Sequence, residues 1–386
     1  MQFEAECISG LEQFAAAELA GLVRGGAGKR TGDGRLPLSR KRERGPWGSR
    51  AAEGPHGGLS GGEGKPARVA LAVGAPTPGV VPFEYDGPWP ALLRLRTVVA
   101  VHAVLATGLP RPTALLGDST FRQLVATVGH MRSLYPAGAF RTYRLSAAGA
   151  DSAVFQRVLA RLTEETGLRQ AEDAGDVLLR FRRGPDGRFE LLARISPRPL
   201  AARAWRVCNR PGSLNAAVAS IMAGLTNPRP RDTYLNLACG SGTLLIERAL
   251  LGGGKRLIGC DLAPDAIACA GQNVTAADVP VELADWDATA LPLEAGSIDA
   301  LTVDLPFGQL VGSHTDNATL YPALLAEAAR VARPGALLAA ITQQVRLFER
   351  SVDPEQWQSE AVFRPILSTS GGPIKPGIYV LRRLGA

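Results

Sequence analysis

In Leu235-Asn-Leu-Ala-Cys-Gly-Ser-Gly-Thr243, an apolar strand candidate ends in a glycine turn and passes directly into a helix. Gly240 and Gly242 allow the backbone to approach a ligand closely, and the helix N-terminus behind them offers unpaired N–H groups. Such a turn could hold a dinucleotide, but the third glycine of that fingerprint is missing from its usual place. The stretch therefore predicts a ligand-binding turn at the end of a buried strand.

Strand and helix candidates alternate from Thr233 onward at the spacing of βαβ units. The segments are 234–237, 243–251, 256–260, 264–273, 281–283, 300–303, 320–331 and 336–343. This alternation is typical of a doubly wound, largely parallel α/β sheet. Because such sheets bind ligands at the carboxyl ends of their strands, the residues that directly follow these strands are the candidates for a site.

Acidic residues follow the second and third strands of this series. Asp261 comes directly after strand 256–260, where a carboxylate can accept hydrogen bonds from both hydroxyls of a ribose. Asp285-Trp-Asp-Ala288 follows the third strand and supplies a carboxylate for the amino group of an adenine. Each aspartate alone could be an ordinary surface acid. The order of turn and acids favours a cofactor that contains a nucleoside.

The fourth strand delivers Asp304-Leu-Pro-Phe307 to the same sheet edge. An exocyclic base amine is a poor nucleophile, because its lone pair is delocalised into the ring. Two acceptors, the Asp304 carboxylate and a backbone carbonyl near Leu305, would hold the amine hydrogens and orient the lone pair. Phe307 can stack on a flipped-out base, and Pro306 stiffens the turn. The alternative is a capped turn after a strand, without chemistry.

The first half of the chain has a different, mixed α+β pattern. A strand at 3–7 and a helix at 10–19 open it, and a hairpin at 177–195 turns through Gly184-Pro-Asp-Gly187. Between them, residues 24–66 are rich in Gly, Arg, Ser and Pro without periodicity, which indicates a basic, disordered insertion. We expect four units: 1–90, 91–195, a linker at 196–212, and 213–386, where Ser213 would cap a helix reaching Leu225.

Composition adds weaker constraints. The net charge is +7 and the pI is about 9.4, which favours an acidic partner such as nucleic acid, although an arginine-rich composition can also follow from a GC-rich genome. The five cysteines are odd in number and lack a CxxC pair, so we expect reduced, mostly buried thiols rather than disulfides or a zinc site. Without a long apolar run or a signal peptide, a cytosolic location is expected.

These motifs resemble the class I methyltransferase fold, and within it the amino-methyltransferases with an Asp/Asn-Pro-Pro-Tyr/Phe motif. The whole chain is similar to the THUMP-containing tRNA guanine-N2 methyltransferases. Before the catalytic domain, the similarity is carried by the opening Phe3-Glu-Ala-Glu-Cys7, by Leu92-Leu-Arg-Leu-Arg-Thr97 and by residues 110–195, which match the THUMP pattern of strand, helix and hairpin. Arg203-Ala-Trp-Arg206 with Arg210-Pro-Gly-Ser-Leu214 resembles the family's linker and entry helix, and Gly371-Gly-Pro-Ile-Lys-Pro-Gly-Ile-Tyr-Val-Leu381 resembles its terminal strand. Leu305, where many relatives have proline, and Asn236-Leu-Ala, where Asp-Pro is common, depart from the pattern.

The resemblance implies a Rossmann-like class I methyltransferase domain preceded by a ferredoxin-like and THUMP region. It implies S-adenosyl-L-methionine as cofactor, no metal, and tRNA as partner, bound at the acceptor end by the THUMP unit and by arginines of the linker. A cytoplasmic monomer is expected. The implied catalytic residues are Asp304, Pro306 and Phe307. The implied cofactor-binding residues are Asn236, Ala238, Gly240, Gly242, Thr243, Asp261, Leu262, Asp285, Asp287, Ala288 and Asp304.

The expected reaction is methyl transfer to the N2 amine of a guanosine in the acceptor stem of tRNA, at position 6 in preference to position 10. The same Asp-x-Pro-Phe chemistry would serve an adenine-N6 or guanine-N2 methyltransferase that acts on rRNA or DNA. A non-catalytic RNA-binding protein that keeps the fold is a third possibility. A THUMP-like first half favours RNA, whereas a DNA enzyme needs a target-recognition domain.

Overall fold

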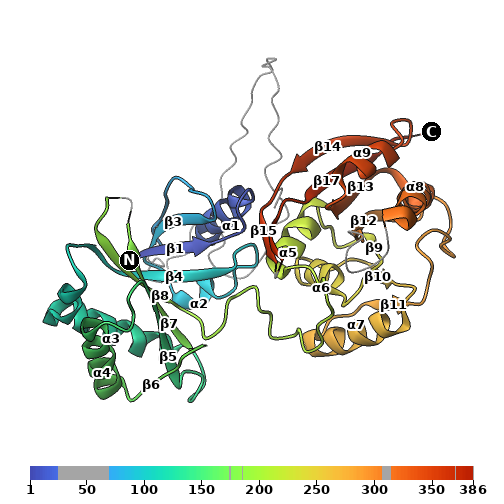
Figure 1. Cartoon of the computed structure of the whole chain (residues 1–386). Coiled ribbons are helices and arrows are strands. Elements are labelled where there is room, and N and C mark those ends of the chain that lie inside the picture. Colours follow the sequence, from blue (N-terminus) through green and yellow to red (C-terminus); the bar gives the residue numbers. More distant parts are fainter. Residues whose placement is uncertain (25–68, 174, 185, 307–313, 370, 386) are drawn as a thin grey trace, which may run out of the picture.

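The chain forms two bodies that lie side by side and are joined by an extended segment (Figure 1). The computed structural model describes residues 1–24, 69–173, 175–184, 186–306, 314–369 and 371–385. The insertion expected at 24–66 lies almost entirely outside these residues. We call residues 1–195 the N-terminal body, residues 196–212 the linker and residues 213–385 the C-terminal body. Among the described residues, no helix is both long and apolar enough to cross a bilayer.

One eight-stranded sheet forms the N-terminal body. Its strands, in spatial order, are β2 (Leu71–Val73), β3 (Val80–Tyr85), β1 (Gln2–Glu6), β4 (Ala100–Leu109), β8 (Phe189–Arg194), β7 (Val177–Arg183), β5 (Thr142–Ala147) and β6 (Arg169–Gln170). Its helices are α1 (Glu12–Arg24), α2 (Trp89–Leu92), the 3₁₀ helix η1 (Pro112–Leu116), α3 (Asp118–Ser133) and α4 (Ala153–Thr166). Strand β4 pairs with β1 on one side and with β8 on the other, so the predicted units 1–90 and 91–195 share one sheet.

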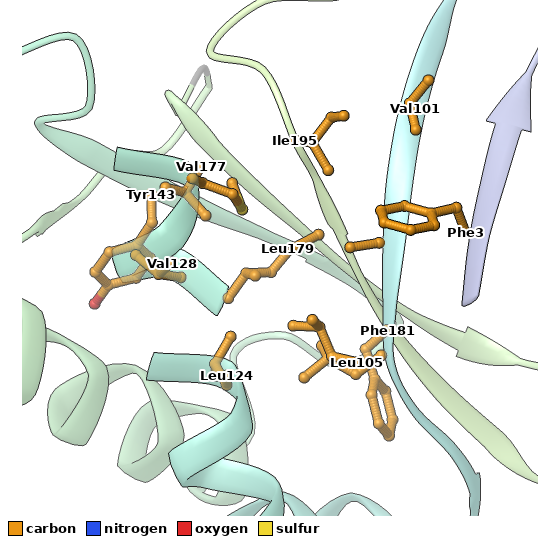
Figure 2. Packing of buried hydrophobic residues seen from close by; sticks show 14 of the residues in the cluster. Phe3, Val101, Leu105, Leu124, Val128, Tyr143, Val177, Leu179, Phe181 and Ile195 are labelled. Atoms are coloured by element: carbon orange, nitrogen blue, oxygen red, sulfur yellow. The ribbon is translucent and has the colours of Figure 1, made fainter. Parts of the chain in front are cut away.

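Alternation along the strands explains why this sheet buries one face under its helices. In β1, Phe3 and Ala5 are buried, whereas Glu4 and Glu6 are partly exposed on the other face. Figure 2 shows Leu105 beside Phe181, with Leu124 of α3 on the helix side of the sheet. The sequence analysis did not identify β3 and α3, because Pro82 lies within β3 and polar residues interrupt the apolar pattern of α3.

The C-terminal body is built on a seven-stranded sheet. Its strands, in spatial order, are β11 (Glu282–Ala284), β10 (Arg256–Cys260), β9 (Thr233–Leu237), β12 (Ile298–Asp304), β13 (Ala332–Thr342), β17 (Gly377–Arg383) and β14 (Trp357–Phe363). All pairs are parallel except those of β17, which runs antiparallel to both neighbours. The helices are α5 (Ala216–Leu225), α6 (Thr243–Leu250), α7 (Pro264–Ala277), α8 (His314–Val331) and α9 (Val345–Ser351). A hairpin of β15 (Leu367–Thr369) and β16 (Gly372–Ile374) precedes β17.

Both faces of this sheet are buried. Along β13, Leu338 and Ala340 pack into the core that contains residues of α8, whereas Ala339 and Ile341 pack into the core that contains residues of α5. A sheet covered on both faces explains why its strands are apolar runs rather than alternating ones. The predicted doubly wound α/β class is confirmed.

The start of α5 differs from the prediction. The helix begins at Ala216, and its N-cap is Asn215, whose side chain accepts a hydrogen bond from Ala217 N at 2.9 Å. Ser213 instead accepts a hydrogen bond from Arg210 N and lies 3.2 Å from the Ser241 hydroxyl. Asn and Ser are comparable caps, so the sequence alone does not decide between them.

The two bodies also share an apolar core. Leu11 and Phe14, at the start of α1, pack with Val218 of α5 and with Ile378 of β17. The Phe14 ring meets Phe363 of β14 edge to face at 5.1 Å between centroids. This core fixes α1 against the back of the C-terminal sheet.

Candidate cofactor and base site

The glycine turn after β9 is open on the side where a ligand would lie. Ala238, Gly240 and Gly242 have φ angles of 46°, 55° and 77°. A Cβ atom added to Gly240 would have no neighbour within 4 Å, whereas one added to Gly242 would lie 3.3 Å from the Cβ of Ala270. Gly242 is therefore needed for its left-handed conformation and for close packing of α6 on α7, and Gly240 leaves free space.

Asp261 connects the glycine turn to the end of β10. Its Oδ2 accepts a hydrogen bond from Gly240 N at 2.8 Å, and its Oδ1 accepts one from Ala263 N at 3.0 Å. A carboxylate oxygen can accept more than one hydrogen bond, so both atoms keep capacity for the hydroxyls of a ribose. The neighbouring Leu262 is 67% exposed and offers an apolar surface to a flat ring. These residues fit a nucleoside-containing cofactor.

The aspartates after β11 have different surroundings. Asp287 accepts hydrogen bonds from Thr289 N at 2.8 Å and from the Thr289 hydroxyl at 2.7 Å, and these bonds lower the pKa of its carboxyl. Asp285 is exposed, and Ala288 packs at the margin of the core. Asp287 is thus an oriented, ionised acceptor at the sheet edge, suited to an adenine amino group.

Two residues predicted to contact the cofactor have side chains engaged elsewhere. Asn236 is buried within β9, and its Nδ2 donates to Leu237 O and Thr302 O at 3.2 Å each. The Thr243 hydroxyl, at the start of α6, accepts a hydrogen bond from Arg206 at 2.8 Å. These contacts stabilise the glycine turn on the side that faces the protein interior, opposite the side where Gly240 leaves free space.

Asp304 ends β12 at the same sheet edge as the glycine turn. Val303 pairs with Leu237 in the parallel register, so Asp304 and Ala238 leave their strands next to each other. Burial raises the pKa of the Asp304 carboxyl to about 7. Among the described residues, no group donates a hydrogen bond to this carboxylate.

The backbone after Asp304 has one occupied and one available carbonyl. Pro306 O accepts hydrogen bonds from Asn317 Nδ2 at 2.9 Å and from the Tyr321 hydroxyl at 2.7 Å. Leu305 N donates to Ile341 O at 3.0 Å, while the Leu305 carbonyl accepts no hydrogen bond within the described part of the chain. The Asp304 carboxylate and the neighbouring Leu305 carbonyl are thus two acceptors without a donor among the described residues. Phe307, predicted to stack on the base, lies outside the described residues.

The sequence analysis missed the residues that hold this turn. Asn317 is fully buried in α8, and the Tyr321 hydroxyl also lies 2.8 Å from the Thr342 hydroxyl at the end of β13. Burial, with a contribution from the charge of Asp304, raises the pKa of Tyr321, so the phenol stays protonated. The only sequence signal was an Asn and a Tyr one helical turn apart on an otherwise apolar helix face.

Two arginines of the linker, Arg203 and Arg206, have side chains that bind within the protein. Arg203 Nε donates to Glu247 Oε1 at 2.8 Å, and the side chain is only 7% exposed. Arg206 donates to Leu214 O and to the Thr243 hydroxyl, both at 2.8 Å. These contacts within the protein engage most of both guanidinium groups, and phosphate contact by the linker arginines stays a prediction.

The linker is also fastened to α7 by a disulfide. Cys208 is bonded to Cys269, across 61 residues of sequence. Asn273 adds hydrogen bonds to Val207 N, Cys208 N and Cys208 O at 2.9 Å each, and to Ser241 O in the glycine turn. The expectation of reduced cysteines throughout is wrong for this pair; Cys7, Cys239 and Cys260 are free and buried.

Known proteins resemble the C-terminal body in sequence and the entire chain in fold. Residues 203–370 match the UPF0020 family, described as an RMKL-like methyltransferase domain. Most of the C-terminal body is therefore similar to a methyltransferase domain. The structure of TrmN from Thermus thermophilus has a TM-score of 0.66 at 20% identity and covers 99% of each chain. At this identity, the likeness concerns the fold.

Curated relatives match this chain over part of their length. A stretch of 189 residues is 30% identical to the mouse protein named tRNA (guanine(6)-N(2))-methyltransferase THUMP3, covering 45% of this chain and 37% of that protein. A stretch of 203 residues is 25% identical to the tRNA (guanine(6)-N2)-methyltransferase of Methanocaldococcus jannaschii, covering 42% and 53%. The matched stretches thus span about half or less of these relatives.

Proposed function

We propose that this protein uses S-adenosylmethionine to methylate the N2 amine of a guanosine in tRNA. The observation that carries the proposal is the pair of acceptors at the end of β12, the Asp304 carboxylate and the Leu305 carbonyl, beside the open glycine turn. Relatives named as tRNA guanine-N2 methyltransferases support the choice of amine and of RNA.

The cofactor is proposed to lie along the carboxyl edge of the sheet. Gly240 and Gly242 would border its methionine end, Asp261 would bind the ribose hydroxyls, and Leu262 and Asp287 would contact the adenine. When bound, S-adenosylmethionine supplies a methyl group activated by a sulfonium. Because that group is already reactive, the protein contributes mainly position and electrostatics.

The proposed chemistry uses Asp304 in two ways. Its carboxylate and the Leu305 carbonyl accept the two amine hydrogens, which turns the nitrogen lone pair toward the methyl group. As the N–C bond forms and the S–C bond breaks, the amine becomes cationic and must lose a proton. A carboxyl with a pKa of about 7 is suited to accept that proton near neutral pH. Asn317 and Tyr321 keep the turn in place by holding Pro306 O.

The proposal also covers the position of the methylated nucleotide, the RNA-binding unit, the oligomeric state and the location in the cell. We place the target in the acceptor stem, at position 6 in preference to position 10, because the relatives named above carry position 6 in their names. We assign RNA binding to residues 91–195 as a THUMP-like unit, and we propose a monomer that works in the cytoplasm.

A methylation assay tests the proposed function. The purified protein is incubated with labelled S-adenosylmethionine and unmodified tRNA transcripts, and the nucleosides are then analysed by mass spectrometry. We expect N2-methylguanosine, and fragment mapping locates it. Asp304→Ala should lower kcat by at least about 100-fold while donor affinity stays within a few-fold, and Asp353→Ala, at a partly exposed acid before β14, serves as control. Methyl transfer to adenine, or an active Asp304→Ala variant, would contradict the proposal.

A further inference from the structure

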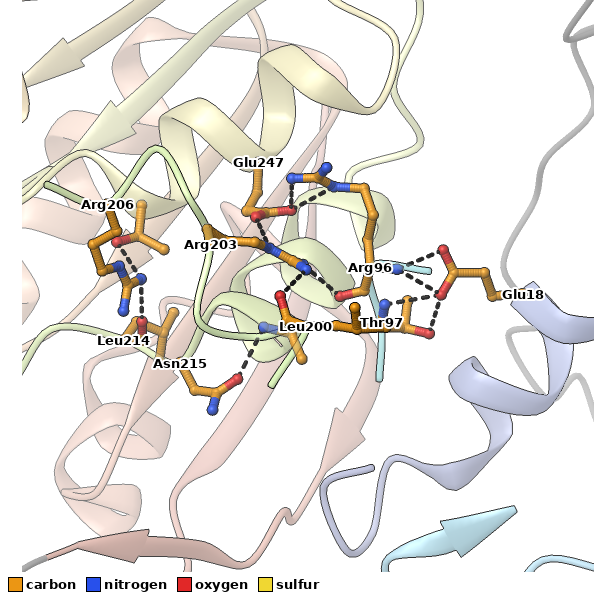
Figure 3. Close-up of polar contacts among 11 residues, drawn as sticks. Glu18, Arg96, Thr97, Leu200, Arg203, Arg206, Leu214, Asn215 and Glu247 are labelled. Carbon is orange, nitrogen blue, oxygen red and sulfur yellow. Dashed lines mark hydrogen bonds and ion pairs between the residues drawn. The ribbon is translucent and has the colours of Figure 1, made fainter. Parts of the chain in front are cut away.

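Glu247 is a fully buried carboxylate that receives arginines from outside its own body. It lies on α6, the helix that begins directly after the glycine turn. Arg96 of the N-terminal body approaches Glu247 Oε2 with Nε and Nη2, both at 2.8 Å, and Arg203 of the linker donates to Oε1 at 2.8 Å. Figure 3 shows the carboxylate between the two guanidinium groups.

The same contacts continue into α1 of the N-terminal body. Both carboxylate oxygens of Glu18 accept a hydrogen bond from Arg96 N, at 2.9 and 3.0 Å. Glu18 also accepts hydrogen bonds from Thr97 N at 2.9 Å and from the Thr97 hydroxyl at 2.6 Å. A continuous polar chain therefore runs from α1 through residues 96 and 97 to α6 (Figure 3).

Arg203 of the linker closes this series of polar contacts into a ring, which we call the polar ring. Arg203 donates to Arg96 O and to Leu200 O, both at 2.7 Å, in addition to Glu247. Three residues further, Arg206 holds Thr243, the first residue of α6. The linker thus fixes the backbone of the N-terminal body to the helix that supports the glycine turn.

A buried carboxylate with two cationic partners specifies the geometry of its surroundings. Movement of the N-terminal body would separate Arg96 from Glu247 and leave charge buried with fewer partners, which is strongly unfavourable. The shared core around Phe14 fixes the other side of α1 against β14. Any RNA contact on the N-terminal body is therefore held at a set distance and angle from Asp304.

We propose that Glu247 is a positioning residue: through Arg96 and Arg203, it fixes the N-terminal body relative to the glycine turn and so determines which nucleotide of a bound RNA reaches Asp304. This inference rests on the proposed methylation of tRNA. It assigns no contact with substrate or cofactor to Glu247. Loosening the ring should change where the methyl group is placed more than how well the donor binds.

The test uses Arg96→Ala, because Arg96 is at the margin of the ring with 21% of its side chain exposed. We expect kcat/KM at the main site to fall about 10- to 100-fold through kcat, with KM for the donor unchanged and methylation spread over neighbouring guanosines. Arg96→Lys, which keeps the charge, should restore the main site in part. Arg256→Ala, which removes an exposed Arg–Glu pair between β10 and β11, is the matched control and should behave as wild type.

The inference would be overturned if Arg96→Ala methylated the same nucleotides in the same proportions as wild type. It would also be overturned if the only change in Arg96→Ala were a lower affinity for the donor. Hydrogen exchange gives a readout that does not need methylation. The amide of Ala201, in the linker, donates a hydrogen bond to Val99 O of the N-terminal body. The hydrogen exchange rate of this amide should increase in Arg96→Ala and stay unchanged in Arg256→Ala. Unchanged exchange would also overturn the inference. If wild type methylates adenosine instead, the proposed function fails, and the spread of sites is measured on adenosine.

Discussion

At the scale of single residues, Asp304 is partly buried and accepts no hydrogen bond from the described residues. Most buried carboxylates are satisfied by hydrogen bonds or ion pairs, as Glu247 is in α6. Asp304 has no such donor among the described residues, and burial raises its pKa to about 7. Perturbed acids of this kind are concentrated at functional sites. The protein thus keeps a destabilising group where the proposed reaction needs an acceptor.

The raised pKa of Asp304 predicts opposite pH effects on activity and stability. In wild type, kcat/KM should rise between about pH 6 and pH 8 as the carboxyl ionises. The native state keeps the proton up to about pH 7, whereas the unfolded chain loses it near pH 4. Between about pH 4 and pH 7 the native state therefore binds more protons than the unfolded chain. The contribution of Asp304 to the free energy of unfolding falls as the pH rises through this range.

Asp304→Asn separates these effects. The amide cannot take up a proton, so we expect kcat about 100-fold lower, without the rise between pH 6 and pH 8. Its Tm should exceed that of wild type by a few degrees at pH 8, and the difference should shrink toward pH 5. Thermal melts and initial rates at the two pH values measure both. A wild-type rate that does not change across this range would argue against an ionising Asp304.

At the scale of elements, local patterns were predictable and long-range contacts were not. The strand, turn and helix around Gly240 follow from neighbouring residues, and so does Asp261 at the end of β10. The Asn317 and Tyr321 contacts with Pro306 could not be foreseen, because they depend on where α8 lies against β12. The linker arginines were assigned to RNA because sequence cannot tell which carboxylate comes within reach.

The disulfide is the clearest case of a contact that sequence spacing cannot reveal. Cys208 and Cys269 are 61 residues apart, and only the fold of the linker onto α7 joins them. Cys208→Ser should lower the free energy of unfolding by up to about 4 kcal/mol, since the cross-link restricts the unfolded chain. Melts with and without dithiothreitol measure this. The variant and reduced wild type should coincide, and equal Tm values without reductant would show that the bond does not form.

At the scale of the whole molecule, two unlike contacts hold α1 to the C-terminal body. One is the apolar core around Leu11 and Phe14, and the other is the polar ring around Glu247. Apolar burial supplies free energy without direction, whereas the buried ion pairs demand one geometry. Together they make the two bodies a single unit, which is required if an RNA held on one body is to be modified on the other.

This arrangement predicts that wild type unfolds in one cooperative transition and that Phe14→Ala divides it. The Phe14 ring is fully buried between the bodies, so its loss should cost about 3–5 kcal/mol and let the C-terminal and N-terminal bodies melt separately in differential scanning calorimetry. Phe155→Ala is the matched control. Its ring meets Phe181 edge to face at 5.1 Å, as Phe14 meets Phe363, but entirely within the N-terminal body. It should lower the Tm of one undivided transition, because the contacts between the bodies remain. A single transition in Phe14→Ala would mean that the polar ring alone keeps the bodies coupled.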